Sequence, residues 1–190
     1  MTAIIDYKAG NLTSVKYAFD ALGHETVVTC DPVVVEAADR VVFPGVGAAR
    51  SAMETLSSLG LEQAVRRAAA EKPFLGICLG MQILFENTEE DGGVDCLGLV
   101  PGRVRRFPDG VDKIPQIGWN DVAVQGRANE YYYFVHSYYA ELCRHTAGVT
   151  EYAGVRFTSI VRKGNILACQ FHPEKSGKAG LKLLKEWLEC

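Results

Sequence analysis

Short buried runs alternate with helical patterns along the first half of this chain. Residues 2–5 and 40–43 are dominated by Ile, Val and other apolar residues, and the segment between them spaces Val15 and Phe19 as one face of a helix does. A further apolar run, residues 73–77, precedes another helical stretch that continues through residue 85. Strands that alternate with helices favour a parallel sheet with helices on both faces and a functional site at the carboxyl ends of its strands. The sequence therefore predicts an α/β fold with a mostly parallel central sheet.

The second half of the chain has a different texture, because Gly, Pro and short alternating apolar runs replace the helical patterns after about residue 92. Such runs are typical of antiparallel strands. The candidate strands cover residues 104–107, 121–124, 131–139, 155–162 and 166–171. A final helix is predicted over residues 177–188, and no linker, repeat or low-complexity segment divides the chain. We therefore expect a single domain, residues 1–190, in which an antiparallel extension joins the parallel sheet.

Charge and hydropathy limit the classes of partner. The chain has 190 residues, 48% of them hydrophobic, and a formal net charge of -3. Lys and Arg are dispersed, so nothing predicts binding to nucleic acid or to a membrane surface. No window approaches the ~18 apolar residues of a membrane span, and Asp6 interrupts the amino terminus before a signal peptide could form, so a cytoplasmic protein is expected. The six cysteines lie far apart without a Cys-x-x-Cys pair, which predicts free thiols.

One cysteine, Cys78, lies between two glycines directly after the run 73–77. A strand-turn-helix elbow of the form Gly-x-Cys-x-Gly forces its central residue into a tight turn, where only small residues such as Gly76 and Gly80 fit at the flanks. This geometry exposes the sulfur at a helix amino terminus, where the helix dipole favours the nucleophilic thiolate. The N–H of Leu79 would then point to a developing oxyanion. The alternative is a buried structural thiol beside incidental glycines, and the motif alone does not decide between the two.

A second motif, Gln-Phe-His-Pro-Glu, ends a predicted strand at residues 170–174. Side chains two positions apart in an extended segment share a face, so Glu174 can reach the imidazole of His172 and fix its tautomer, while Pro173 keeps the segment extended. A base oriented by a carboxylate is what a cysteine nucleophile requires. An incidental His and Glu in a surface loop are the alternative, which the glycine elbow around Cys78 disfavours.

A glycine-rich turn follows the strand predicted at residues 40–43. The segment Pro-Gly-Val-Gly, residues 44–47, lets backbone amides approach a ligand and would supply a second oxyanion donor, although alone it is typical of an ordinary strand-to-helix turn. It lacks the Gly-Lys-Ser/Thr ending of a phosphate-binding loop. His24 and His145 are expected at the surface, and His136 ends an aromatic strand and stays ambiguous. No His, Cys or acidic pair shows the spacing of a metal site.

The glycine elbow and the later His-Pro-Glu sequence resemble the class I (triad) glutamine amidotransferases, which hydrolyse glutamine and hand ammonia to a synthase. The match narrows to the glutaminase subunits of imidazole glycerol phosphate synthases, because further segments follow in the same order. They are Asp6-Tyr7, Gly10-Asn11-Leu12, Ser14-Val15, residues 44–48, residues 76–82, Gly118-Trp119-Asn120, residues 134–138 and residues 170–177. The resemblance implies the flavodoxin-like fold of that family, and it implies no cofactor.

The resemblance also implies a role for individual residues. Cys78 would attack the side-chain amide carbon of glutamine, His172 would relay the proton to the departing ammonia, and Glu174 would orient His172. The oxyanion hole would be formed by the N–H of Leu79 and one backbone amide of the segment Val46-Gly47. The glutamine pocket would be lined by Gly47, Gln82, His136, Ser137 and Tyr138.

By the same resemblance, the partner is a separate cyclase subunit, a (β/α)8 barrel, with which the chain would form a heterodimer. The cyclase uses the ammonia to make imidazole glycerol phosphate and an aminoimidazole carboxamide ribotide, for histidine and purine synthesis. At 190 residues, no synthase domain is expected in the chain itself. The residues expected at the interface are Lys8, Asn11, Gln116, Ile117, Trp119, Asn120 and Lys175. Asn11 is also expected to cap the first helix.

Three sites depart from the family pattern without touching the triad. Lys8 stands where small or flexible residues are usual, Gln116 where His is common, and Ala49-Arg50 where Phe-Gly is more usual. The first two bear on docking to the partner and on activation by it. We expect the isolated chain to be a poor glutaminase that the cyclase activates, because the glycine-flanked segment at Val46 can change its peptide orientation.

Three other interpretations stand beside this one. A glutaminase could serve a different synthase, of the pyridoxal phosphate or anthranilate type, but the segments Gly118-Trp119-Asn120 and Lys175-Ser176-Gly177 argue against it. A cysteine peptidase or a stress-type thiol protein would not need the His-Pro-Glu order. A regulatory subunit with a dead site is disfavoured because all three triad residues are present.

Overall fold

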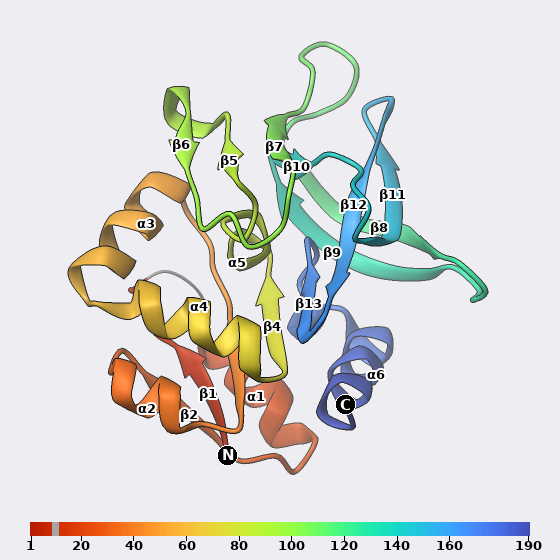
Figure 1. The fold of residues 1–190 in the computed structure, drawn as a ribbon. Coiled ribbons are helices and arrows are strands. Elements are labelled where there is room, and N and C mark those ends of the chain that lie inside the picture. The colour runs from red at the N-terminus through yellow and green to blue at the C-terminus, as the bar shows by residue number, and fades with distance from the viewer. Residues whose placement is uncertain (9–11) are drawn as a thin grey trace.

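The computed structural model describes residues 1–8 and 12–190, and five parallel strands form one end of its sheet in the order β2-β1-β3-β4-β13 (Figure 1). In that order they cover Thr26–Thr29, Thr2–Ile5, Arg40–Phe43, Phe74–Ile77 and Ile166–Cys169. The predicted α/β fold with a mostly parallel central sheet is confirmed. Asn11, predicted as a helix cap and an interface residue, lies outside the described residues.

Helices cover both faces of the parallel strands. They are α1 (Leu12–Ala21), α2 (Pro32–Ala37), α3 (Ala49–Ser58), α4 (Leu61–Glu71), α5 (Leu79–Gln82) and α6 (Gly177–Leu188). Successive residues of a strand point to opposite faces. Val41 and Phe43 of β3 therefore pack in one core with α3 and α4, whereas Val42 packs in a second core with α1 and α6. Two apolar faces explain why β1 is buried at every position.

A largely antiparallel extension continues the sheet beyond β13. Its strands are β5 (Asn87–Thr88), β6 (Val94–Asp95), β7 (Arg103–Arg106), β8 (Gln116–Val124), β9 (Glu130–His136), β10 (Tyr138–Ala140), β11 (Thr146–Tyr152) and β12 (Val155–Lys163). β12 pairs with β13 across a tight turn at Gly164 and Asn165, and β11, β8 and β9 branch from β12 (Figure 1). Two short 3-10 turns, η1 (Glu90–Gly92) and η2 (Pro173–Lys175), complete the elements near the sheet edge.

Helix α2 and strands β5, β6 and β11 are not among the predicted elements, and β8 begins at Gln116 rather than at residue 121. Three further elements differ from the prediction in extent or pairing. The helix predicted through residue 85 is only the short α5, because the carbonyls of Ile83, Leu84 and Phe85 accept bonds from the loop at residues 97–100 instead of continuing the helix. The strand predicted over residues 131–139 is split into β9 and β10 by Ser137. β13, predicted as antiparallel, is antiparallel to β12 but parallel to β4, because the hairpin returns the chain beside β4.

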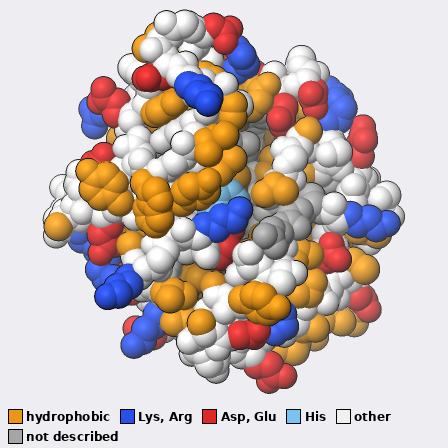
Figure 2. Space-filling view, turned by 180° about the vertical axis from the view of Figure 1, so that it is seen from behind, with side chains coloured by type: hydrophobic (Ala, Val, Ile, Leu, Met, Phe, Trp, Pro, Cys, Tyr) orange, Lys and Arg blue, Asp and Glu red, His pale blue; other side chains and the backbone are white. Residues whose placement is uncertain are grey.

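All six cysteines are free thiols, as predicted, and only Cys78 and Cys169 among them are buried. Within residues 1–8 and 12–190, no helix is long and apolar enough to cross a membrane, and no group of three or more His, Cys, Asp or Glu could hold a metal ion. Figure 2 shows hydrophobic side chains gathered on one face of the molecule beside a histidine and a basic side chain. Charged side chains of both signs lie mostly toward the rim of this view.

Candidate active site

Cys78 joins β4 to α5 in a strained turn. Its backbone angles, φ 54° and ψ -112°, lie outside the regions that L-residues favour. A Cβ at Gly80 would lie 1.9 Å from the carbonyl oxygen of Phe43, and one at Gly76 would lie 3.0 Å from the Cβ of Ala168. The turn therefore has no room for a Cβ at Gly80 and little room for one at Gly76, and it holds the cysteine at the carboxyl end of β4.

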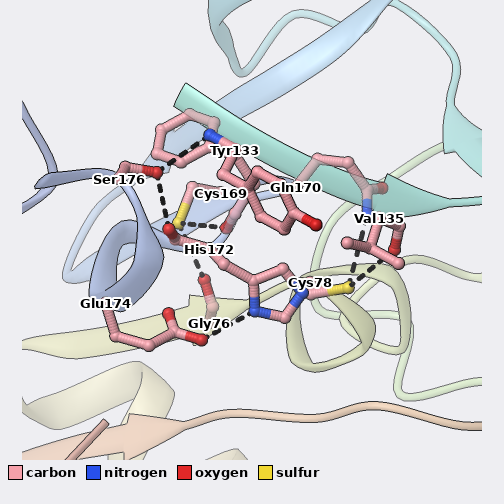
Figure 3. Close-up of polar contacts among 10 residues, drawn as sticks. Gly76, Cys78, Tyr133, Val135, Cys169, Gln170, His172, Glu174 and Ser176 are labelled. Carbon is pink, nitrogen blue, oxygen red and sulfur yellow. Dashed lines mark hydrogen bonds and ion pairs between the residues drawn. The ribbon is translucent and has the colours of Figure 1, made fainter. Parts of the chain in front are cut away.

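His172 and Glu174 lie beside this elbow, just after the neighbouring strand β13 (Figure 3). Nδ1 of His172 lies 2.7 Å from Oε1 of Glu174, and both side chains are almost fully buried. The residues after His172 form the turn η2 rather than the extended segment that the sequence predicts, yet the turn still brings the carboxylate to the ring. The imidazole lies between the carboxylate and the thiol of Cys78. A thiol, a base and an orienting carboxylate are therefore in contact in that order.

The protonation of His172 follows from these contacts. Burial disfavours the charged imidazolium, but hydrogen bonds and charge interactions with Cys78 and Glu174 outweigh burial and raise the pKa of His172 above its usual range. With Nδ1–H donating to the carboxylate, the other ring nitrogen faces the sulfur. A cation in that place favours the thiolate form of a neighbouring cysteine.

The dipole of α5 contributes less than the sequence suggests. This helix has only four residues, and few aligned peptides give a weak dipole. Side chains and backbone surround the sulfur instead. Nε2 of Gln170 lies 3.8 Å from Sγ of Cys78, and the carbonyl oxygen of Val135 lies 3.9 Å from it. The environment of the nucleophile is therefore set by its neighbours across the sheet edge.

The backbone amide predicted to stabilise an oxyanion already has a partner. The N–H of Leu79 donates to the carbonyl oxygen of Gly45 at 3.3 Å. Val46 is 42% exposed, and Gly47 adopts a φ of 101° with open space where a Cβ would stand. The segment is therefore free to turn a peptide, while in the present conformation the Leu79 amide is not available to an oxyanion.

A cavity of about 320 Å³ opens at Cys78 and His172. It is bordered by every residue predicted for a glutamine pocket: Gly47, Gln82, His136, Ser137 and Tyr138. Gln82 is held in place on its wall, because its Nε2 donates to the carbonyl of Tyr138 at 2.8 Å and to Oε1 of Gln170 at 2.9 Å. A larger hollow of about 750 Å³ lies between the extension and α6, and none of the predicted site residues borders it.

Glu90 borders the same cavity, and the sequence does not single it out. Burial raises the pKa of Glu90, although its Oε2 accepts a bond from the N–H of Ala49 at 2.6 Å. Arg50 donates to the carbonyls of Asp91 and Gly93, each at 3.1 Å, so the start of α3 holds the loop that carries Glu90. A carboxylate on this wall can bind the ammonium group of an amino acid. It stands in a run of acidic residues in which no pattern marks a binding residue.

His136 and Gln116 are paired inside the molecule. Nδ1 of His136 lies 2.8 Å from the carbonyl of Tyr138 and therefore carries a proton, because a carbonyl can only accept. Burial lowers the pKa of His136 to about 4, so Nε2 is an acceptor at neutral pH. The amide of Gln116, 3.0 Å away, must turn its NH2 to that nitrogen. Gln116 is only 3% exposed, so its side chain does not present the partner surface that the sequence predicts.

Other residues predicted for a partner interface are exposed. Ile117 and Trp119 are 59% and 56% exposed, large values for apolar side chains. Lys8 and Lys175 lie at the surface, and Lys175 also borders the cavity. Asn120 is partly buried, and its Nδ2 donates to a backbone carbonyl of the extension. Exposed apolar residues of β8 are thus the part of this set that most favours contact with another protein.

The family model described as "Glutamine amidotransferase class-I" matches residues 3–189. Two similar proteins are named "Imidazole glycerol phosphate synthase subunit HisH". The one from Methylococcus capsulatus is 50% identical, with 98% of this chain and 94% of that protein covered. The one from Methanothermobacter thermautotrophicus is 47% identical, with 100% and 98% covered.

A similar fold is found in a solved structure titled "Crystal structure of glutamine amidotransferase", with a TM-score of 0.79 at 21% identity, covering 98% of this chain and 97% of that one. A second, titled "Structure of PurLQS from Thermotoga maritima", gives a TM-score of 0.75 at 16% identity, covering 99% and 97%. At such identities the likeness concerns the fold alone. The sequence matches carry the finer conclusion: this chain belongs to the class-I glutamine amidotransferase family and, within it, to the imidazole glycerol phosphate synthase HisH subunits.

Proposed function

We propose that this chain is the glutaminase subunit of an imidazole glycerol phosphate synthase and releases ammonia from glutamine for histidine biosynthesis. The observation that carries the proposal is the contact of Cys78, His172 and Glu174, in that order, at the mouth of a cavity. The HisH relatives, aligned over nearly the whole chain, support the same choice against other synthases.

In the first half of the reaction, Cys78 acts as the nucleophile. Its sulfur attacks the side-chain amide carbon of glutamine, so that a C–S bond forms and the carbonyl electron pair moves to oxygen. His172 gives its proton to the amide nitrogen, the C–N bond breaks, and ammonia leaves. Glu174 holds the ring in the required tautomer and stabilises its positive charge.

In the second half, water removes the thioester. His172, now neutral, takes a proton from water, the hydroxide attacks the thioester carbon, and the C–S bond breaks with its electron pair on sulfur. Glutamate leaves, and the thiolate and imidazolium are restored. Glu90 and Gln82 border the same cavity, so the carboxylate of Glu90 would bind the ammonium group of glutamine and Oε1 of Gln82 would accept a further bond from it.

The isolated chain should be slow, because the N–H of Leu79 is occupied by the Gly45 carbonyl. Rotation of the peptide between Gly45 and Val46 would withdraw that oxygen and turn the Val46 N–H to the reaction site. One oxyanion donor is worth roughly 2.7–4 kcal/mol, or about 10²- to 10³-fold in rate. A partner that drives this rotation would therefore activate the enzyme.

The partner is a cyclase subunit with a (β/α)8 barrel, and the two form a heterodimer in the cytoplasm. The exposed Ile117 and Trp119 of β8, with Lys175 at the cavity mouth, support docking on this side. Ammonia released at Cys78 would then pass to the cyclase, which makes imidazole glycerol phosphate and an aminoimidazole carboxamide ribotide. The whole chain, residues 1–190, would act as one glutaminase domain.

Glutamate release tests the proposal when it is measured with and without the cyclase and its nucleotide substrate. We expect weak release by the isolated chain, an increase of at least about 100-fold in the complex, and none from Cys78→Ala in either state. Activity that survives in Cys78→Ala would show that Cys78 is not the nucleophile. Equal turnover with and without the cyclase would remove the activation step.

A further inference from the structure

The side-chain amide of Gln170 points at the sulfur of Cys78. Its Nε2 lies 3.8 Å from Sγ, and the residue is fully buried, with 0% exposure. Gln170 follows β13 directly and precedes His172 by two residues, so that both side chains reach the sulfur from the same strand end (Figure 3). The triad mechanism leaves this contact without a role.

Neighbouring bonds determine which end of the Gln170 amide faces the sulfur. The carbonyl of Tyr138 can only accept, so the group of Gln82 that lies 2.8 Å from it is the NH2. The same NH2 lies 2.9 Å from Gln170, which must therefore present its oxygen there. The remaining end, the NH2 of Gln170, is the one that meets Cys78. The opposite orientation would set two NH2 groups against each other in a buried site.

A donor in this place acts on the charge of the sulfur. An N–H stabilises a thiolate much more than a neutral thiol, whose sulfur is only a weak acceptor, whereas the carbonyl of Val135, 3.9 Å from Sγ, accepts from a thiol and repels a thiolate. The four-residue α5 supplies little dipole to offset that repulsion. The amide of Gln170 is a neutral donor that offsets it.

We propose that Gln170 is a hydrogen-bond donor to the nucleophile, which stabilises the thiolate of Cys78 before attack and again when the C–S bond of the thioester breaks. In the second event the electron pair of that bond returns to sulfur, and the N–H is already in place to receive the charge. The proposal rests on the proposed function only in taking Cys78 as the nucleophile. In this proposal two groups act on the sulfur of Cys78: His172 transfers the proton, and Gln170 donates a hydrogen bond without transferring a proton.

Alkylation of Cys78 by iodoacetamide, followed by mass spectrometry as a function of pH, tests the proposal without glutamine or the cyclase. The variants are Gln170→Met, which keeps the length without a donor, and Gln170→Glu, which is nearly isosteric and places an acceptor against the sulfur. We expect the rate at pH 7 to fall about tenfold in the first and further in the second, with the pH profile displaced upward. Thr150→Val is the matched control, since this buried hydroxyl, 2% exposed, bonds the carbonyl of Asp121 in the extension and should leave the profile unchanged.

Urea unfolding shows whether each variant is folded, and folded variants whose alkylation profiles overlay that of the wild type would overturn the proposal. If both Gln170 variants are unfolded, a measurement on the wild type still tests the proposal. The side-chain amide NMR signals of Gln170 must shift with pH at the midpoint of Cys78 alkylation, and Cys78→Ala must abolish that shift. Gln170 amide signals that do not shift with the ionisation of Cys78 would overturn the proposal. The alkylation profiles of the variants could be displaced while the wild-type complex does not hydrolyse glutamine. That result would contradict the proposed function but would support Gln170 as a hydrogen-bond donor to Cys78.

Discussion

Replacing Gly80 by Ala adds one methyl group at the point where α5 meets β3. The added Cβ would stand 1.9 Å from the carbonyl oxygen of Phe43 and 2.8 Å from its carbonyl carbon. Both are backbone atoms of a buried central strand, so no side chain can rotate to make room. In an ordinary helix position the same change stabilises the protein by roughly 0.5–1 kcal/mol. A loss of unfolding free energy in Gly80→Ala would therefore indicate the steric conflict.

The size of the effect follows from the distance. Real Cβ atoms essentially never lie closer than 3.0 Å to such atoms, so the strand and the elbow must part by about 1.1 Å. Overpacking of this kind typically costs about 1–3 kcal/mol, which exceeds the helix gain. A shift of that size at Cys78 also misplaces the nucleophile, and a 1 Å error costs on the order of 100-fold in rate. Gly80→Ala should therefore lose about 1–2 kcal/mol of unfolding free energy and about 100-fold in glutamate release.

Urea unfolding and glutamate release with the cyclase measure the two effects. Gly148→Ala is the matched control, because its Cβ would meet Ile160 and Val122 at 2.9 Å, which also crowds a buried site, but in the extension and against side chains. We expect this control to lose stability while keeping its turnover. A Gly80→Ala protein with the stability and turnover of the wild type would refute the claim that the elbow is fixed by this backbone contact.

Three further predictions concern single contacts of the site. Glu174→Gln keeps a hydrogen bond to His172 but removes the charge, so kcat should fall roughly 10³- to 10⁴-fold with KM little changed, and steady-state kinetics of the complex showing full kcat would count against the triad. His136 stays neutral when folded but takes up a proton below about pH 6.5 when unfolded, so its stabilising contribution is present above pH 6.5 and is lost as the pH falls to about 4. Between pH 7 and pH 4, urea unfolding should show that the wild type loses up to about 3 kcal/mol more unfolding free energy than His136→Gln does. Equal losses in the two proteins would contradict the assignment of a neutral, buried His136. Arg50→Ala frees the loop that carries Glu90 and should raise the KM for glutamine several-fold at nearly constant kcat, whereas an unchanged KM would remove that bracing role.

The parts of the site that the sequence predicts are those encoded by neighbours in the chain. Gly76, Cys78 and Gly80 stand within one turn, and His172 and Glu174 stand two apart, so local geometry identifies each group. Parallel strands end at one edge of a sheet, which is what brings the two groups together. The sequence analysis places residues 166–171 among antiparallel strands, so the parallel pairing of β13 beside β4, which joins the two groups, is a long-range contact that the sequence does not predict.

Contacts between distant segments could not be predicted in the same way. The bond from Leu79 to the carbonyl of Gly45 depends on the rotation of one peptide, which leaves no trace in residue type. Strand β8 places a polar residue inward and an apolar one outward, with Gln116 opposite His136 on β9 and Ile117 exposed, so hydropathy alone assigns the wrong side.

Helix α2 was predictable from the residues at its start, although the sequence analysis does not predict it. Asp31 accepts a bond from the N–H of Val33 and Pro32 occupies the first turn, which together are a common helix start. The run of three valines that follows has the composition of a strand, and it masks the start. In so short a segment the capping residues, rather than the β-branched composition, determine the structure.

Mass spectrometry of the complex, quenched in acid during turnover with glutamine, shows whether Cys78 carries the glutamyl group. We expect a γ-glutamyl adduct on the peptide that contains Cys78, built up within the first turnover and absent from Cys78→Ala. An adduct on a different residue, or turnover in Cys78→Ala at the wild-type rate, would contradict this assignment.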